Sequence, residues 1–312
     1  MPSRKKNDNT VSRRSFLINS SLASAGLLLS SKYVAAANQQ KPNSKFAGVQ
    51  VGVITYSYRD MPGDIHQILK YITDSGVSAV ELMGDAVEAY AGKPTDKAAV
   101  AAWRATAPMD KFMEVKKMFD KAGVSIYAFK PNALNPDNTD AEIEYALKVA
   151  KTLGAKSVTI ELPDNPAHSK RLGDLAAKHK VYIGYHAHTQ ATDTAWDTAL
   201  SQSPYNSMNL DCGHYIAAGG ANTPDTLLAL IQAKHDRITS MHLKDRKNKT
   251  NGGNNMPWGE GDTPIPAILQ LLKEKKYAIP GSIELEYEVP AGSDAVQEVK
   301  KCVAFAKKAL GA

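Results

Sequence analysis

The sequence predicts a single α/β domain built as a closed (β/α)8 barrel. Short β-rich runs alternate eight times with longer runs of helical spacing over about 260 residues, which is the usual size of this architecture. Gly76, Gly123 and Gly154 each separate a helical run from the next strand, as glycines that end helices do. The rival architecture is an open doubly wound sheet, but its Gly-x-Gly-x-x-Gly motif does not follow the first strand, where Thr-Tyr-Ser-Tyr stands at 55–58.

The strands are predicted from short runs rich in β-branched and aromatic residues. In chain order these runs are Val49–Tyr56, Ala79–Met83, Val124–Phe129, Ser157–Leu162, Val181–His186, Ser207–Leu210, Ile238–Leu243 and Ser282–Tyr287. Helices are predicted between them, among them Asp64–Ser75, Asp110–Ala122 and Ala141–Leu153, the last with a continuous apolar stripe. The segment Asp85–Met109 is longer than an ordinary connection, so we expect a flap over one end of the barrel.

The composition is that of a folded globular chain. The 312 residues are 43% apolar and 22% charged, which excludes an intrinsically disordered chain. The two cysteines, Cys212 and Cys302, are too few for a disulfide scaffold or a Cys-based zinc module. The net charge is +6, but residues 1–37 hold six basic residues and one acidic one, which leaves 32 basic and 31 acidic residues beyond them. The body therefore gives no electrostatic argument for binding nucleic acid or an anionic membrane.

Residues 1–37 are predicted to be an export signal. Arg13-Arg14-Ser15-Phe16-Leu17 opens a mostly apolar stretch, and Ala35-Ala36-Ala37 offers small residues for cleavage. The arginine pair resembles the bacterial twin-arginine signal, which implies transfer of the folded protein by the twin-arginine translocation machinery to the periplasm. A membrane anchor is the alternative, although the stretch is short and rich in Ser, Gly and Ala. Residues 38–48 are expected to be a linker and residues 49–312 the barrel.

Polar residues gather where the predicted strands end. The carboxyl ends of parallel barrel strands meet at one mouth, so these side chains are expected to lie close together. They are Glu81, Lys130, Glu161, His186, His188, Asp211, His214, His242, Asp245, Glu284 and Glu286. Carboxylates with imidazoles suit a divalent ion such as Mn, Zn or Co. The remaining histidines are expected to be solvated, and they are His66, His168, His179 and His235.

Several of these residues also have an ordinary structural interpretation. Glu81 could be a metal ligand or pair with a basic neighbour, and Lys244 could anchor an oxyanion or pair with Asp245 or another neighbour. Asp211 could be a ligand or simply cap a helix. Cys212 is expected to be a packed side chain rather than a nucleophile.

Four motifs in chain order resemble the xylose isomerase-like TIM barrel superfamily of sugar phosphate isomerases and epimerases. They are Tyr185-His186-Ala187-His188, Asp211-Cys212-Gly213-His214, His242-Leu243-Lys244-Asp245 and Ile283-Glu284-Leu285-Glu286-Tyr287. Each motif is weak alone, but four on consecutive strands are specific, and the resemblance spans residues 49–310. The superfamily includes ketose 3-epimerases, inosose dehydratases and endonuclease IV. The near-neutral charge of the body argues against DNA as the substrate.

The resemblance implies a divalent metal ion (Mn, Zn, Co or Mg) held by Asp211, His242 and Glu284. His186 stands near the place of the glutamate that completes this site in the epimerases, and we predict it as the fourth ligand. Glu161, one strand earlier, is the alternative, and the sequence does not choose between them. Because the usual glutamate pair of the epimerases is incomplete, dehydration or elimination stays open beside isomerisation and epimerisation.

These inferences predict a sugar isomerase or epimerase that removes a proton next to a carbonyl through an enediolate. The acid–base residues would be Glu161, His188 and Glu286, and the substrate contacts Lys130, His214 and Trp258, although Trp258 could only cover the core. The alternatives are a metal-dependent lyase or dehydratase on 3-keto sugars or glycosides, and a non-catalytic periplasmic sugar-binding protein. The expected partner is a small sugar and not nucleic acid, and a homo-oligomer is compatible with the sequence.

Overall fold

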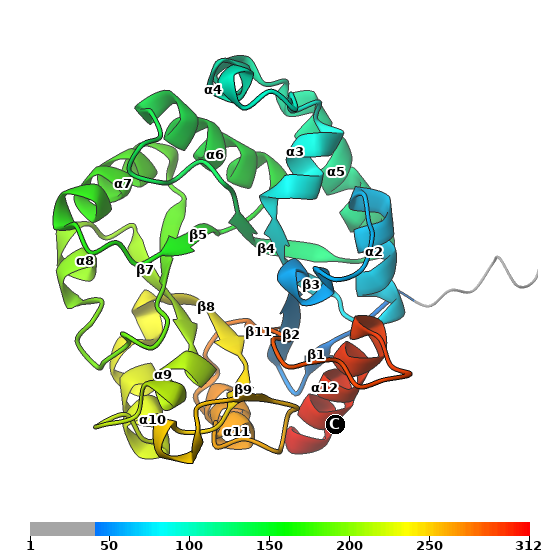
Figure 1. Cartoon of the computed structure of the whole chain (residues 1–312), viewed down its shortest axis with the longest axis vertical. Helices are drawn as coiled ribbons and strands as arrows, with labels where there is room; N and C mark the ends of the chain where they lie inside the picture. Colours follow the sequence, from blue (N-terminus) through cyan, green and yellow to red (C-terminus); the bar gives the residue numbers. More distant parts are fainter. Residues whose placement is uncertain (1–40) are drawn as a thin grey trace, which may run out of the picture. The chain divides into compact units, whose positions relative to one another are not determined.

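A closed barrel of eight parallel strands forms the centre of the molecule, in a computed structural model that describes residues 41–312 (Figure 1). The strands are β2 Val49–Ile54, β3 Ala79–Met83, β4 Ser125–Lys130, β5 Ser157–Glu161, β6 Tyr182–His186, β7 Asn206–Asp211, β8 Ile238–Leu243 and β11 Gly281–Ile283. Each strand pairs with its neighbours in chain order, and pairing of β2 with both β3 and β11 closes the ring. The predicted single-domain (β/α)8 TIM barrel fold is confirmed.

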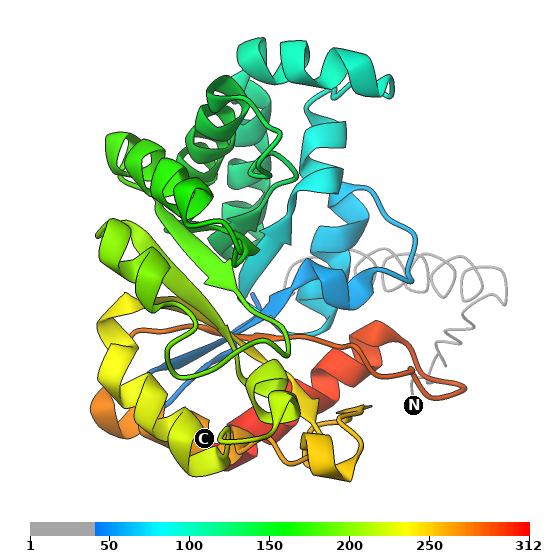
Figure 2. The same ribbon diagram turned by 60° about the vertical axis from the view of Figure 1, so that its left-hand side comes forward.

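Helices surround the strands and shield their outer faces. They are α2 Ile65–Asp74, α3 Gly84–Tyr90, α4 Lys97–Thr106, α5 Met109–Ala122, α6 Asp140–Leu153, α7 Pro166–His179, α8 Asp197–Gln202, α9 Cys212–Ala218, α10 Pro224–Lys234, α11 Ile265–Lys275 and α12 Ala295–Ala309. Figure 2 shows α5, α6 and α7 side by side outside the strands, where the apolar stripe of α6 is buried. Gly123 and Gly154 end α5 and α6 with φ of 79° and 81°, the left-handed conformation that glycine adopts without strain.

The barrel unit begins earlier than predicted. Residues 45–46 form a short strand, β1 Lys45–Phe46, which pairs antiparallel with β2. Ser44 is buried, and its hydroxyl donates to the carbonyl of Val51 at 2.6 Å. The predicted boundary at residue 49 is therefore corrected, because the end of the expected linker pairs with the first residues of β2. The predicted export signal, residues 1–37, lies outside the described residues.

The predicted flap over the mouth is wrong, because this segment forms helices outside the barrel. The segment between β3 and β4 folds into α3, α4 and α5, and α4 packs against α6. Trp103 of α4 meets Tyr145 of α6 edge to face, with ring centroids 5.7 Å apart. Figure 1 places α4 at the rim of the helical ring rather than over the barrel axis. Apolar and charged contacts with α6 hold the segment outside the barrel.

The final strand is shorter than predicted. Pairing ends at Ile283, and residues 284–287 continue as irregular chain held by the amide of Leu285, which donates to Ser57 Oγ at 3.1 Å. A small hairpin, β9 Asp245–Arg246 with β10 Asn255–Met256, follows β8. None of the helices between residues 41 and 312 combines the length and apolar character needed to cross a membrane.

Candidate metal centre and active site

The register of the strands brings the predicted metal ligands to one level of the barrel. Asp211 pairs with His242 across the β7–β8 ladder, and His186 ends β6. Glu284 follows directly after β11, whose Ser282 pairs with His242. The four side chains predicted as ligands are all buried: His186, Asp211, His242 and Glu284.

The potential ligand atoms of these four residues lie 3–4 Å from their neighbours. His242 Nδ1 is 3.1 Å from Glu284 Oε2 and 3.7 Å from Asp211 Oδ2. His186 Nε2 lies 3.9 Å from Asp211 Oδ2. Ligands that each bind one ion at about 2 Å are separated by about 3–4 Å. The spacing therefore suits a single metal ion.

Three of these atoms, Asp211 Oδ2, His242 Nδ1 and Glu284 Oε2, are buried and make no hydrogen bond of regular geometry in the described part of the chain. Their close contacts are ionic, between His242 Nδ1 and Glu284 Oε2 at 3.1 Å and between Lys244 Nζ and both carboxylates. Two buried carboxylates that share one ammonium and one imidazole keep lone pairs that an ion can use. Two carboxylates with two imidazoles are ligands that Zn, Mn and Co accept. The residues present therefore fit a divalent ion.

Glu81 supports His242 from behind and does not join the ligand cluster. Its carboxylate is fully buried, and Oε2 lies 2.9 Å from His242 Nε2. The hydroxyl of Thr159 donates to its other oxygen at 2.7 Å. Burial raises the pKa of Glu81, but the His242 charge outweighs burial and lowers that pKa to about 2. An ionised Glu81 holds the Nε2 N–H of His242 and leaves Nδ1 facing Asp211 and Glu284. Burial lowers the pKa of His242, but Glu284 and Glu81 outweigh burial and raise it well above its usual value, so a metal ion would replace the proton on Nδ1.

Asn209 orients His186 by a hydrogen bond, as Glu81 orients His242. The sequence alone did not identify Asn209 as a residue of the site. The Asn209 amide donates to Glu81 at 3.0 Å and to Ser240 Oγ at 2.9 Å. Its oxygen therefore faces His186 Nδ1, 3.3 Å away, and accepts the ring N–H. Burial lowers the pKa of His186 to about 4, so the ring is neutral and presents a lone pair at Nε2 toward Asp211.

Lys244 is the main unexpected feature of the site. Its ammonium is almost completely buried and lies 2.8 Å from Glu284 Oε2, 3.0 Å from Asp211 Oδ2 and 2.8 Å from Glu286 Oε2. Burial lowers the pKa of Lys244, but Asp211 and the two glutamates outweigh burial and raise that pKa above its usual range. A permanent positive charge therefore sits among the site's acids.

Asp245 does not pair with Lys244. Its carboxylate accepts the backbone N–H groups of Gly259, Gly261 and Thr263 at 2.8, 3.0 and 3.2 Å. Asp245 thus orders the loop after the β9–β10 hairpin, and Lys244 is left to face the acids of the mouth.

A second, more exposed group of residues lies at the end of β5. Lys130 Nζ contacts Glu161 Oε1 at 2.9 Å, and His188 Nε2 is 3.5 Å from Glu161 Oε2. About half of the side-chain surface is exposed for Glu161 (48%) and His188 (54%), which leaves both open to a small molecule. His186 rather than Glu161 groups with Asp211 and His242 as possible ligands of one ion.

His214 stands between two cations. Its Nε2 is 2.9 Å from Lys244 Nζ, and its Nδ1 is 2.6 Å from Arg246 Nη1. Burial lowers its pKa to about 4, so the ring is neutral. A neutral imidazole has one acceptor nitrogen, so it accepts from only one of the two cations. Together with His186 and His188, His214 also forms a second set of closely spaced potential ligands nearer the mouth.

Two other predicted residues have packing contacts. Trp258 is nearly buried, its indole N–H donates to the carbonyl of Leu243 at 3.1 Å, and its ring meets Phe305 edge to face. These contacts place it with α12 rather than in the ligand cluster, and its stacking on a sugar stays a prediction. Burial raises the pKa of the Cys212 thiol well above its usual value, as expected for a packed side chain.

The family model of the xylose isomerase-like TIM barrel matches residues 69–308. The chain belongs to this family. No curated protein matches the chain in sequence.

Solved structures of xylose isomerase-like barrels share the fold at low sequence identity. The IolI protein with a bound zinc atom is 17% identical with a TM-score of 0.63, covering 83% of this chain and 98% of its own. A sugar phosphate isomerase/epimerase from Parabacteroides distasonis is 20% identical with a TM-score of 0.58, covering 84% and 95%. The probable 3-DHS dehydratase AsbF from Bacillus anthracis is 15% identical with a TM-score of 0.59, covering 82% and 98%. At these identities the likeness establishes the fold alone.

Proposed function

We propose that this xylose isomerase-like barrel is a divalent-metal-dependent sugar isomerase or epimerase that removes a proton next to a carbonyl. The observation that carries the proposal is the convergence of buried potential ligand atoms from Asp211, His242 and Glu284, with His242 Nδ1 3.1 Å from Glu284 Oε2 and 3.7 Å from Asp211 Oδ2. His186, Asp211, His242 and Glu284 would hold the ion. When bound, a divalent ion polarises a sugar carbonyl and stabilises negative charge on its oxygen.

Two candidate acid–base carboxylates approach this centre from opposite sides. Glu161 ends β5 and Glu286 follows β11, and these strands are four positions apart in either direction around the ring of eight. Epimerisation removes a proton from one face of a carbon and returns one to the other face. Carboxylates on opposite walls of the barrel can serve the two faces in turn.

Each candidate carboxylate contacts a lysine. Burial raises the pKa of Glu161, but the neighbouring His186 and Lys130 outweigh burial and lower it. On the opposite side, Lys244 Nζ lies 2.8 Å from Glu286 Oε2. The ionised carboxylate takes the proton from carbon, and the C–H electron pair moves to the carbonyl oxygen to give an enediolate. Return of a proton from the opposite side gives the epimer. Return to the neighbouring carbon, with transfer of the hydroxyl proton to the former carbonyl oxygen, gives the isomer.

A lyase or dehydratase acting on 3-keto sugars or glycosides is the second candidate. It needs the same proton removal followed by loss of a β-substituent, which leaves with a proton. Lys244 and His214 contact each other on the Glu286 side of the site, and the Lys244 ammonium would exchange one carboxylate contact to donate to a departing oxygen. The similar fold of a probable dehydratase is compatible with this reaction.

The decisive experiment is solvent exchange in deuterated water. Metal-loaded protein is incubated with free sugars and 3-keto glycosides, and NMR follows deuterium uptake at carbons next to the carbonyl. Uptake that disappears after chelation supports proton removal at the metal centre. The absence of uptake across the panel, or equal uptake with and without chelator, would contradict the proposal. A non-catalytic sugar-binding protein would bind sugars without exchange and without need of a metal.

We also propose that the protein is exported by the twin-arginine route. Support comes from the arginine pair and the apolar stretch within residues 1–37. The full chain carrying both R13K and R14K is expected to stay in the cytoplasm, whereas the unchanged chain is recovered from the periplasm. Equal distribution of the two forms would argue against this route.

A further inference from the structure

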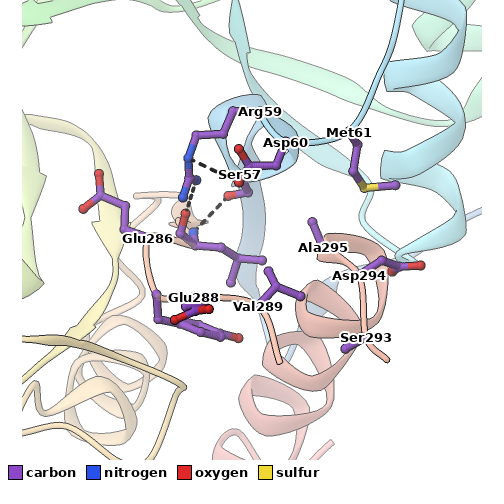
Figure 3. Close-up of a pocket in the computed structure, with 12 residues that line it drawn as sticks. Ser57, Arg59, Asp60, Met61, Glu286, Glu288, Val289, Ser293, Asp294 and Ala295 are labelled. Carbon is purple, nitrogen blue, oxygen red and sulfur yellow. Dashed lines mark hydrogen bonds and ion pairs between the residues drawn. The ribbon is translucent and has the colours of Figure 1, made fainter. Parts of the chain in front are cut away.

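A cavity of about 510 Å³ opens beside Glu286, between the β2–α2 loop and residues 285–295 (Figure 3). Met61 and Val289 form an apolar part of the cavity wall, and Arg59 lies along the upper edge of the cavity in this view. Its volume falls within the range of pockets that enclose small ligands, about 300–1,000 Å³. The cavity is therefore large enough for a ring-sized group.

The cavity adjoins the proposed catalytic centre through Glu286. This residue lines the cavity, while its carboxylate contacts Lys244 Nζ at 2.8 Å. Figure 3 shows the Glu286 carboxylate directed away from Met61 and Val289. A molecule that reacts beside Glu286 can thus extend a second part into the cavity.

The side chains of the cavity accept hydrogen bonds but have few protons to give. Ser57 donates its hydroxyl proton to the carbonyl of Ile283, and Ser293 donates to Glu298 Oε1 at 2.5 Å. Arg59 Nη1 donates to the carbonyl of Leu285 at 2.6 Å, and its guanidinium lies over the Tyr56 ring. These contacts use the two serine hydroxyls and one of the three guanidinium nitrogens of Arg59, so Arg59 is the main side-chain donor that the lining keeps.

The acceptors are carboxylates, and they outnumber the cation of the lining. Asp60, Glu288 and Asp294 contribute three negative charges, against the single positive charge of Arg59, while the Glu286 carboxylate is paired with Lys244. Ionised carboxylates accept hydrogen bonds and do not donate them. A phosphate is also an acceptor and is negatively charged, so this lining repels it. A hydroxylated, uncharged ring has the donors that these carboxylates need.

We infer that this cavity is a subsite for a second, uncharged sugar ring, so that the substrate is a neutral glycoside rather than a sugar phosphate. The inference rests on the proposed function, because it needs the reacting sugar to lie beside Glu286. The side chains of Met61 and Val289 would pack against the face of the second ring. The hydroxyl groups of that ring would donate to the carboxylates of the rim.

Binding measurements on the zinc-loaded full chain test the subsite. Calorimetry compares the dissociation constants of glucose, glucose 6-phosphate and the two glucose disaccharides cellobiose and maltose. The same comparison is made with galactose, galactose 6-phosphate and galactose disaccharides. We expect at least one disaccharide to bind about tenfold or more tightly than its free hexose, and the phosphate to bind more weakly than the hexose. A phosphate that binds more tightly, or disaccharides that never exceed their hexose, would overturn the subsite, as would a complete lack of sugar binding.

Substitutions in the cavity separate its role from folding. V289W and, independently, M61W fill the cavity at partly exposed positions and should bring the disaccharide-to-hexose ratio close to one. E288Q with D294N should weaken the discrimination against phosphate. The matched control is E274Q, an exposed acid on α11 remote from the cavity, which should leave both ratios unchanged. Unchanged ratios in V289W and M61W would also overturn the subsite.

Failure of the subsite and failure of the proposed function give different results. If the binding ratios hold while deuterium uptake is absent, the subsite stands and the proposed reaction falls. If uptake occurs while the ratios equal one, the reaction stands and the subsite falls.

Discussion

At the scale of single residues, the site depends on side chains that touch no substrate. Glu81 and His242 are 161 positions apart in sequence, yet their contact fixes which nitrogen of His242 faces the ligand cluster. Asn209 joins Glu81 to His186 and so orients both imidazoles. Such orienting partners commonly change metal affinity by about 10–100-fold.

Replacing Glu81 with Gln should therefore weaken metal binding. E81Q removes the negative charge that fixes the His242 N–H on Nε2, so we expect the dissociation constant for zinc to rise by about 10–100-fold. Competition with a chromophoric chelator measures it. Unfolding midpoints of the chelated proteins, and E274Q as the surface control, show whether the fold is intact. An unchanged zinc affinity in folded E81Q would refute the orienting role.

The two candidate bases should be separable by substitution. E161Q and E286Q should each lower turnover by about 10²–10⁴-fold, the usual contribution of a general base, while zinc content stays near that of the unchanged protein. If each carboxylate serves one face, E161Q should block deuterium uptake from one epimer and E286Q from the other. Full activity in either variant would remove that residue from the mechanism.

The sequence was sufficient to predict which residues gather, but not what each one touches. Asp211, His242 and Glu284 could be predicted because strand ends converge in a barrel. The inward turn of Lys244 depends on Asp245 being used by backbone amides of a later loop. His168 was wrongly expected to be solvated, because its partner, the carbonyl of Leu134 at 2.8 Å, belongs to a different loop.

At the scale of elements, a buried ion cluster holds the added helix α4 to the barrel. Arg104 of α4 contacts Glu88 of α3 and Glu142 of α6, each at 3.2 Å, and all three side chains are buried. Glu142 also belongs to the capping box that begins α6 with Thr139. The cluster explains why this segment lies on the outer ring rather than over the mouth.

Removing Arg104 should release α4. R104M leaves two buried carboxylates without their shared partner, and breaking a buried pair costs about 3–5 kcal/mol. We expect a corresponding loss in the free energy of unfolding and faster amide exchange across residues 97–106. Guanidinium unfolding and hydrogen exchange measure both effects. The i,i+4 surface pair Lys170–Asp174 provides the control, since K170M should change stability by less than about 1 kcal/mol.

The contribution of Glu142 should depend on pH in a defined direction. Burial raises the pKa of Glu142, but Thr139 and Arg104 outweigh burial and lower that pKa below its ordinary value of 4.5. The carboxylate therefore stabilises the fold above about pH 4.5 and loses this effect as pH falls through the lower folded value. The stability difference between the unchanged protein and E142Q should shrink between pH 7 and pH 3. A difference that grows on acidification would contradict this assignment.

Element boundaries were predictable where local chemistry sets them. Asp64 caps α2, and the glycines after α5 and α6 adopt the expected left-handed conformation. The early end of β11 was not predictable, because it depends on Ser57, which accepts the amide of Leu285 from 228 residues away. The position of α4 likewise depends on long-range ion pairs rather than on its own sequence.

At the scale of the whole molecule, closure of the barrel links the proposed metal centre to global stability. The candidate ligands come from β6, β7, β8 and the chain after β11, which together make up half of the ring. A ligand that binds only the folded state stabilises it by about 2.7 kcal/mol at a hundredfold excess over its dissociation constant.

Zinc or manganese should therefore raise the thermal midpoint of the protein. Chelation should lower the midpoint, and D211N should show little response to added metal because it lacks one ligand charge. Scanning calorimetry with and without chelator measures the shift. A thermal midpoint that changes with neither metal nor chelator would show that no ion binds the native barrel selectively.

The most direct test is the metal content of the purified full chain after loading and removal of loosely bound ions. Elemental analysis should find about one divalent ion per chain in the unchanged protein. D211N and H242Q should retain about tenfold less while keeping the same circular dichroism spectrum. A folded, unchanged protein without bound metal, or variants that retain as much metal as it does, would contradict the metal centre on which the proposed chemistry depends.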